Sequence, residues 1–469
     1  MILYVARVIL ISLEVLILFN LLIVVHELGH FLAARWRGLY IEKFGIWFGK
    51  PLWKKTINGV QYSLGSLPFG GFVALPQLAP MDIIEGKADV DRAKLPRVSA
   101  LDKIIVALAG PFFSLMLAFA FATIVWTVGY PVSEADMTTT VGYVEDDSPA
   151  AKAGIRAGDK ILEVDAKLVK RFLGMNDSVT WNVIRSEGNT IPVKVERDGK
   201  ILDFEVFPYK AETSTWRRKS VRQVMIYPAV TPLILKVEED TPAAKAGLLA
   251  GDVVVRLNGE RVYSPAALAG RIEKYPNDEL TLGIQRGADL VEAKLRPVLL
   301  PTEGQTKSRI GIQWDPGGRM SIAHPGPIEQ VYNSVTSTLQ TLGAVVSPKS
   351  DIKLQHMSGP IMIVRIYYLL FESDYGWQLA LWFSVVLNVN LAILNMLPIP
   401  VLDGGHIVLG IIESVRRKPL NTRALELVQG VCTALIIGLI LYISFFDIGD
   451  LFGKQDRPAP KKPAPTEAR

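Results

Sequence analysis

The chain of 469 residues is 49% hydrophobic with a mean hydropathy of +0.27, which is too apolar for an ordinary soluble protein and indicates membrane spans joined to soluble domains. Its net charge of +5 is small for this length, and no basic cluster has interleaved aromatic residues, which argues against a nucleic-acid-binding protein. Cys432 is the only cysteine, so the sequence excludes intramolecular disulfides and metal sites built from several thiolates.

Four segments each meet the requirement of about 20 apolar residues for a helix that crosses the hydrocarbon core. They are residues 8–34, 104–128, 376–397 and 427–446. No small-residue cleavage site follows the first segment, which predicts a retained transmembrane helix rather than a signal peptide. A shorter apolar run, 361–371, is interrupted by Arg365 and is typical of an interfacial or buried helix.

Basic residues in the loops predict the orientation. The loop 31–100 and the loop between the third and fourth spans are rich in Lys and Arg, so the positive-inside rule places both in the cytoplasm. Residues 129–375 and both termini then lie outside, although the Lys and Arg residues of the tail argue weakly the other way. The predicted regions are a first transmembrane helix (1–34), a cytoplasmic loop with a membrane-associated β region (35–100), a second transmembrane helix (101–129), two soluble modules (130–221 and 222–312), external amphipathic helices (313–375), a third transmembrane helix with the loop after it (376–426), a fourth transmembrane helix (427–447) and a disordered tail (448–469).

The first apolar segment ends in the sequence His26-Glu27-Leu28-Gly29-His30. On a helix, His26 and His30 share one face and can bind the same metal ion, while Glu27 is placed to take a proton from a metal-bound water. The residues before this motif, 8–25, contain Glu14 as their only charge, so the motif lies on a helix that would be buried in lipid.

The cytoplasmic loop contains a predicted hairpin, because Asn58-Gly59 suits the two positive-φ positions of a type I′ turn. The stretch that follows it contains Gly70, Gly71 and Phe72 and lies next to the metal helix in the sequence. Two interpretations are open for this stretch. It forms a sheet edge that enters the membrane face and holds an extended peptide, or it is a loop that covers the end of the first helix.

An internal repeat follows the second span. Residues 144–159 recur as residues 237–252, with an offset of 93 and twelve of sixteen positions identical. In each copy a strand leads to Ser-Pro or Thr-Pro, a short Ala-rich helix ends at glycine, and Gly-Asp turns into a second strand at 160–164 or 253–257. The offset exceeds the roughly 20 to 50 residues of solenoid repeats, so it indicates two tandem modules with separate cores.

This repeat resembles the PDZ domains of bacterial proteases, in which "SPAxxAGxxxGD" is a signature. The resemblance implies an α+β fold that binds peptides by adding a strand to a sheet edge. Alternatively, both modules act only as a steric filter above the membrane. The first copy has Asp165-Ala166 where the second has Asn258-Gly259, so we expect the turn, and with it the groove, to differ.

Two histidines leave a catalytic zinc ion one short of its usual three protein ligands. Pro398 and Pro400 follow the third span and cannot continue a helix, and unwound backbone at membrane depth is tolerated only inside protein or along a cavity. Asp403, followed by two glycines that permit close approach, is therefore the favoured third ligand. Two alternatives stay open: His406 is the ligand, or Asp403 merely caps the helix that starts at Gly404.

The HExxH motif, Ala109-Gly110-Pro111, the paired repeats, residues 358–361 and residues 395–405 together resemble the site-2 protease family, and within it the bacterial members with two PDZ domains. The resemblance covers about residues 1–450 and implies a polytopic α-helical membrane protein with four transmembrane helices, a membrane-associated β-hairpin region and two α+β PDZ domains. It also implies a place in the bacterial inner membrane, with the termini and the PDZ domains on the periplasmic side.

The same resemblance implies that Zn²⁺ is bound by His26, His30 and Asp403, with Glu27 as the catalytic residue. It implies that Asn395, with the nearby Pro398 and Pro400, positions the substrate. Gly70, Gly71 and Phe72 match the family's membrane-associated β segment, which is thought to bind unwound substrate.

The implied activity is that of a zinc metalloendopeptidase that cleaves single-span membrane proteins, such as a trimmed anti-sigma factor or a remnant signal peptide. The other implied partners are peptide ligands of the PDZ domains and the lipid bilayer. The main rival is a non-enzymatic membrane scaffold with a zinc-stabilised bundle, but a structural zinc site normally has four protein ligands and only three convincing ones are visible. A metal transporter is disfavoured because the spans carry no further ladder of histidines or carboxylates beyond Glu14.

Overall fold

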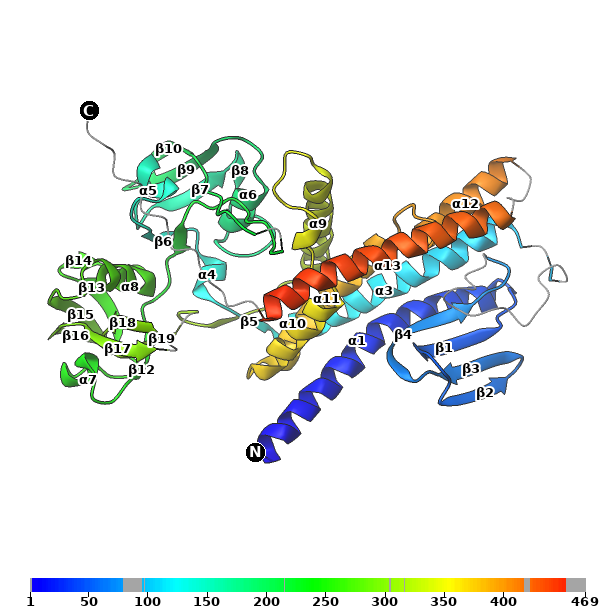
Figure 1. Ribbon diagram of the computed structural model, residues 1–469, viewed down its shortest axis with the longest axis horizontal. Coiled ribbons are helices and arrows are strands. Elements are labelled where there is room, and N and C mark those ends of the chain that lie inside the picture. Colours follow the sequence, from blue (N-terminus) through cyan, green and yellow to red (C-terminus); the bar gives the residue numbers. More distant parts are fainter. Residues whose placement is uncertain are drawn as a thin grey trace. The chain divides into compact units, whose positions relative to one another are not determined.

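The computed structural model describes residues 2–78, 95–96, 98–214, 216–302, 305–315, 317–416 and 422–452. The chain divides into two units, drawn in Figure 1. The helical unit comprises Met1–Tyr130, His324–Gln340 and Leu354–Lys454. The second, α+β unit comprises Pro131–Ala323 and Thr341–Lys353.

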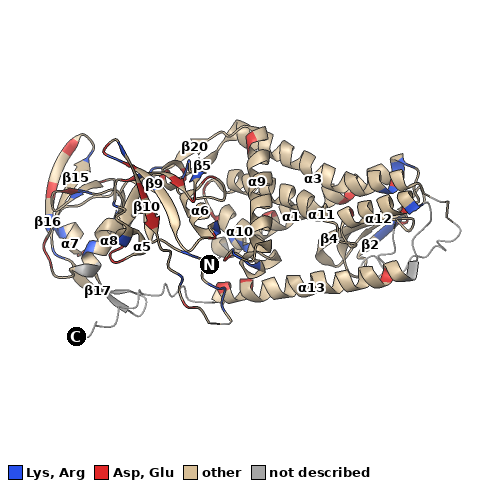
Figure 2. Ribbon diagram, turned by 90° about the horizontal axis from the view of Figure 1, so that it is seen from above, with Lys and Arg blue, Asp and Glu red and all other residues tan. Residues whose placement is uncertain are grey.

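The helical unit is built on long apolar helices. Helix α3 (Ala100–Val128) packs along both α1 (Ile2–Trp36) and α11 (Gly376–Asn395), and the ribbons of α3 and α11 in Figure 2 carry few charged residues. Within the described ranges, four helices are long and apolar enough to cross a membrane, namely Leu3–Trp36, Ala100–Val128, Gly376–Asn395 and Ala424–Phe452. They coincide with the four predicted segments.

The fourth long helix is α13 (Thr422–Phe452). The unit also contains most of α9 (Pro327–Val346), a 3₁₀ turn (Leu354–His356), α10 (Pro360–Glu372) and α12 (Asp403–Arg416). Helix α10 covers the predicted apolar run 361–371 and packs against α11, with Tyr367 fully buried. Helix α13 continues five residues past its predicted end at 447, and residues 453–469 of the predicted tail lie outside the described residues.

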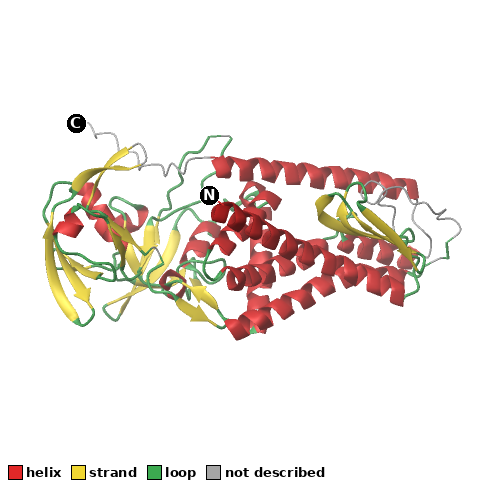
Figure 3. Cartoon of the chain, turned by 90° about the horizontal axis from the view of Figure 1, so that it is seen from below, coloured by secondary structure: helices red, strands yellow, loops and turns green. Residues whose placement is uncertain are grey.

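A four-stranded sheet lies beside these helices, as Figure 3 shows. Its strands are β1 (Lys43–Phe48), β2 (Trp53–Ile57), β3 (Val60–Leu64) and β4 (Leu67–Ala74), in the order β2-β3-β1-β4. The predicted hairpin is confirmed: Asn58 and Gly59 join β2 to β3 with φ values of 51° and 82°. Strand β4 pairs with β1 on one side and contacts α1, so the interpretation of residues 67–72 as a sheet edge is the correct one. Residues 79–94 and 97 of the predicted loop are not described.

The α+β unit contains the two repeated modules. The first has the elements β6 (Val141–Val144), α5 (Pro149–Ala153), β7 (Lys160–Val164), β8 (Lys167–Leu168), α6 (Val179–Arg185), β9 (Ile191–Arg197), β10 (Lys200–Val206) and β11 (Ile226–Pro228). The second repeats them as β12 (Ile234–Val237), α7 (Pro242–Lys245), β13 (Val253–Leu257), β14 (Glu260–Arg261), α8 (Pro265–Lys274), β15 (Leu280–Arg286), β16 (Asp289–Leu295) and β19 (Ile312–Trp314). The hairpin β17 (Val298–Thr302) and β18 (Gln305–Arg309) is inserted before β19, while β5 (Tyr130–Val132), α4 (Glu134–Met137) and β20 (Ser321–Ala323) flank the modules. Each module encloses its own hydrophobic core, as the repeat predicts.

The last residue of each repeat is a buried aspartate that binds an arginine of a later strand in the same module. Asp159 accepts two hydrogen bonds from the guanidinium of Arg197, at 2.6 and 2.7 Å. Asp252 accepts two from Arg286, both at 2.7 Å. Both aspartates are 1% exposed, so the identity of the two repeats at this position has a structural reason.

The turns after β7 and β13 are alike, contrary to expectation. Asp165 and Ala166 have φ values of 53° and 57°, and Asn258 and Gly259 have values of 51° and 84°. Ala166 thus adopts the left-handed conformation without being a glycine, because the flanking β7 and β8 pair as β13 and β14 do. The predicted difference between the two turns is wrong.

Candidate metal centre

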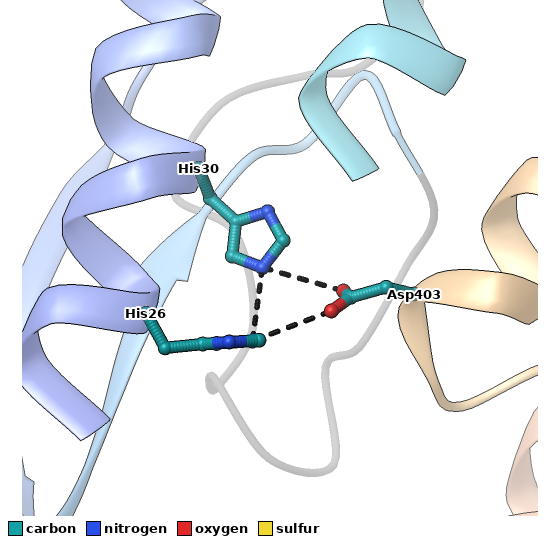
Figure 4. A group of neighbouring side chains, drawn as sticks. All are labelled: His26, His30 and Asp403. Atoms are coloured by element: carbon teal, nitrogen blue, oxygen red, sulfur yellow. Dashed lines mark hydrogen bonds and ion pairs between the residues drawn. The ribbon is translucent and has the colours of Figure 1, made fainter. Parts of the chain in front are cut away.

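The two histidines of α1 face each other across one helical turn. Their side chains leave the same face of the helix, with ring centroids 4.9 Å apart and Nε2 atoms 3.3 Å apart (Figure 4). His26 is 6% exposed and His30 is 9% exposed. This placement follows from the spacing of four residues on a helix, as the sequence predicts.

Asp403 reaches the same point from the first turn of α12. Its Oδ2 lies 3.3 Å from Nε2 of His26, and its Oδ1 lies 3.3 Å from Nε2 of His30. In Figure 4 the carboxylate points at both imidazoles from the opposite side. Its oxygens are therefore engaged across the site rather than in capping α12, and the three donor atoms lie within 4.8 Å of one another.

The glycines after Asp403 permit this approach. A Cβ atom on Gly404 would lie 2.2 Å from the carbonyl oxygen of Met396, and one on Gly405 would lie 2.1 Å from that of Ile399. The chain turns between α11 and α12 at Pro398 and Pro400, so the start of α12 packs directly on this turn. The proline-broken end of the third span is thus what presents the carboxylate.

The donor geometry fits a zinc ion. Two nitrogens that each lie about 2.0–2.1 Å from a tetrahedral zinc ion are about 3.3–3.4 Å apart, which matches the separation of the two Nε2 atoms. Two imidazoles and one carboxylate are also a ligand set that zinc takes in catalytic sites, where a further coordination position stays open. The three side chains therefore satisfy both the chemistry and the spacing of such a site.

Helix α3 holds the far side of both rings. Nδ1 of His26 lies 3.0 Å from Oγ of Ser114, and Nδ1 of His30 lies 2.8 Å from the carbonyl oxygen of Val106. With Nδ1–H donating to these oxygens, each Nε2 lone pair is directed into the site. Gly110 makes room for this packing, since a Cβ atom there would lie 2.1 Å from Nε2 of His30.

Sequence reasoning missed Ser114 and Val106. Ser114 is fully buried, and it lies in an apolar segment without charges. A hydroxyl in such a segment needs a hydrogen-bond partner, and this need could have pointed to Ser114. The contribution of Val106 is a backbone carbonyl, so its residue type carries no signal. Gly110 belongs to the Ala-Gly-Pro pattern on which the family resemblance partly rests, and its role becomes visible only with the helix packing.

A cavity of about 250 Å³ opens beside the three donor groups. Glu27 lines it next to His26 and His30, and Val73 of β4 lines the same cavity. The predicted residues that line this cavity are His26, Glu27, His30, Gly71, Phe72, Asn395 and Asp403, joined by Val401, Leu402 and His406.

Of the predicted residues, Asn395 and His406 line the cavity, whereas Gly70, Pro398 and Pro400 do not. Nδ2 of Asn395 is 3.5 Å from Nε2 of His26, so this side chain adjoins the metal ligands. Pro398 and Pro400 shape the turn, and Gly70 packs under Phe48 in the sheet. His406 lies one turn after Asp403 on α12 and lines the cavity, but it is outside the group of three converging donors.

Comparison with known proteins gives a consistent result. The sequence model of peptidase family M50 matches residues 14–439. A protein of Vibrio cholerae named "Putative zinc metalloprotease" is 27% identical over 453 residues, which cover 92% of this chain and 97% of the relative. The regulator of sigma-E protease RseP of Salmonella typhimurium is 26% identical over 458 residues, again 92% and 97% of the two chains. The crystal structure of a PDZ domain from an SdrC-like protein of Listeria innocua aligns with 18% of this chain and 92% of that domain, at 25% identity and a TM-score of 0.17.

Proposed function

Because the chain belongs to peptidase family M50, we propose that it is an intramembrane zinc metalloendopeptidase that cleaves transmembrane segments of single-span proteins. The observation that carries this proposal is the convergence of two imidazoles of the apolar helix α1 and a carboxylate of α12, beside Glu27 and an open cavity. The zinc cofactor expected from the sequence agrees with the names of the relatives.

His26, His30 and Asp403 are the proposed zinc ligands. Bound zinc supplies Lewis acidity to a water molecule and to the scissile carbonyl. Glu27 lies next to His26 on the cavity wall, where its carboxylate takes the proton of the attacking water and then delivers it to the departing amine. Ser114 and Val106 keep both imidazoles in the tautomer that ligation requires.

The substrate has to be unwound before it can be attacked, since a transmembrane helix satisfies its own backbone amides. Strand β4 offers replacement hydrogen bonds, because it is the edge of its sheet and its residues Gly71, Phe72 and Val73 line the cavity. We assign Asn395 to the same task, since it lines this cavity and its Nδ2 lies 3.5 Å from Nε2 of His26. Gly70, Pro398 and Pro400 contribute by shaping the strand and the turn that flank the bound segment.

The two modules are proposed PDZ domains on the periplasmic side of a bacterial inner membrane, with both termini on that side. Strands β11 and β19 lie in two-stranded sheets with β6 and β12, which suits the addition of a peptide strand. Their size also suits a steric filter that excludes substrates with an intact outer domain. An anti-sigma factor already trimmed by another protease, or a remnant signal peptide, fits such a filter.

The alternative of a non-enzymatic zinc-stabilised scaffold is less well supported. A structural zinc site is normally closed by four protein ligands. Among the described residues, three donors converge, and a cavity lined by Glu27 lies where a fourth ligand would stand. This arrangement favours catalysis.

The test is Glu27→Gln in the full-length protein purified in detergent, with cleavage of a model single-span substrate as the readout. We expect zinc content to be retained and the cleavage rate to fall about 10²–10⁴-fold. Glu14→Gln, which removes a carboxylate from the same helix, serves as the control and should cleave normally. Unimpaired cleavage by Glu27→Gln refutes the role assigned to Glu27. Full zinc occupancy in Asp403→Ala would show that another residue is the third ligand, and His406 would then be the first candidate.

A further inference from the structure

Trp47 occupies an unusual backbone conformation in the sheet beside the metal centre. Its φ of 68° lies in the left-handed region, which bulky side chains rarely adopt. At this point the pairing of β1 with β4 shifts register between Ile46 and Phe48, so Trp47 leaves the regular ladder. Its indole Nε1 then donates a hydrogen bond of 2.8 Å to Oδ1 of Asn20 on α1.

Asn20 also holds the start of β4. Its Nδ2 donates to the carbonyl oxygen of Pro68 at 3.2 Å, and to that of Leu16 in its own helix at 2.7 Å. The side chain is 8% exposed and lies in an apolar membrane helix, where an unpaired amide would be costly. One amide group therefore connects α1 with both β1 and β4.

Strand β4 touches α1 again at the catalytic end. Gly71 and Val73 line the cavity together with Glu27, and a Cβ atom on Gly71 would lie 3.4 Å from Cγ of Glu27. The strand thus runs from the Asn20 contact at Pro68 to the cavity wall at Gly71 and Val73. Loss of the contact between Asn20 and Pro68 is therefore expected to shift Gly71 and Val73, which lie beside Glu27.

We propose that Asn20, the Trp47 indole and the Pro68 carbonyl form a latch that fixes the edge strand β4 against α1 and so positions an extended, unwound substrate segment for cleavage. This inference rests on the proposed function, in which β4 supplies the edge for the substrate. Asn20 and Trp47 are positioning residues here, since they touch neither the metal ligands nor the cavity. The strained backbone of Trp47 is stabilised by the bond that its indole makes.

The latch is tested first without any reference to catalysis. Hydrogen exchange of the full-length protein in detergent is compared between wild type, Asn20→Ala, Asn20→Asp and Trp47→Phe, followed in the segment 67–74. We expect faster exchange in that segment for all three variants and unchanged exchange around His26 and His30. Ser12→Ala is the matched control, because the Ser12 hydroxyl bonds only to the carbonyl of Val8 in the same helix. Unchanged exchange in 67–74 overturns the latch.

The positioning role is tested by steady-state cleavage and by zinc content. Asn20→Ala removes both links from α1 to the sheet and is expected to raise KM about tenfold, with kcat and zinc content unchanged. Trp47→Phe loses the bond from the indole but keeps the bond from Asn20 to Pro68, so it should raise KM less. Faster exchange with unchanged KM refutes the positioning role. The proposed function itself is tested separately: if Glu27→Gln still cleaves the substrate, the proposed function fails, whatever the outcome for Asn20.

Discussion

The hydroxyl of Ser114 is expected to set the zinc affinity of the site. Both it and the His26 ring are buried, and the Oγ atom lies 3.0 Å from Nδ1. Ser114→Ala leaves this ring nitrogen without a partner, so the imidazole loses the contact that fixes its orientation and tautomer. Loss of such an outer contact typically weakens metal binding 10- to 100-fold, which corresponds to about 1.4–2.8 kcal/mol.

The assay is a competition titration of zinc against a chelator, with the full-length protein in detergent. Ser114→Thr keeps the hydroxyl and should retain more affinity than Ser114→Ala. Thr123→Val is the matched control on the same helix, because the Thr123 hydroxyl bonds only to the carbonyl of Phe119. Equal zinc affinity in wild type and Ser114→Ala would show that the hydroxyl does not support the ligand.

Three further predictions concern the metal centre and the second module. Gly110→Ala should abolish zinc binding, because its Cβ atom would lie 2.1 Å from Nε2 of His30; Gly438→Ala, with open space around that glycine, should bind zinc normally in the same titration. The hydrogen bonds from Arg286 lower the pKa of the Asp252 carboxyl in the folded protein. They therefore stabilise the folded state above the pKa of an unfolded aspartate, about 3.9, and this stabilisation is lost as the pH falls through the lower pKa of the folded state. Asp252→Asn should therefore unfold at a lower urea midpoint than wild type at pH 7, and the difference between the two midpoints should become smaller below about pH 4. A difference in midpoint that does not change with pH would contradict this reasoning. Chelation by 1,10-phenanthroline should stop cleavage and added zinc should restore it, whereas loss of activity without zinc-dependent recovery would argue against a zinc enzyme.

Local patterns predicted the framework of the fold. The repeat located β7 and β13 at their observed residues, since proline, glycine and aspartate fix the backbone at each end of the short helices. Asn58-Gly59 located the hairpin for a similar reason. The hydrophobic segments located the long helices, although α13 extends further, where the buried Asp447 accepts hydrogen bonds from the backbone amides of Gly359 and Met362.

Contacts between distant segments were less accessible to sequence reasoning. The spacing of His26 and His30 indicated a shared face, and the glycines after Asp403 indicated a close approach. The bond between Ser114 and His26 depends on how α3 crosses α1, which no single periodicity encodes. The left-handed Trp47 is likewise invisible in a sequence, because its conformation is imposed by a tertiary partner.

The separation of the donor groups along the chain has a consequence for biosynthesis. Asp403 follows His30 by 373 residues, so at a translation rate of about 5–20 residues per second it is made roughly 20–75 s later. During that interval the nascent chain holds two imidazoles and Glu27 in the membrane without the carboxylate that completes the donor set. The order of synthesis thus delays assembly of the donor set until the third long apolar helix has been made.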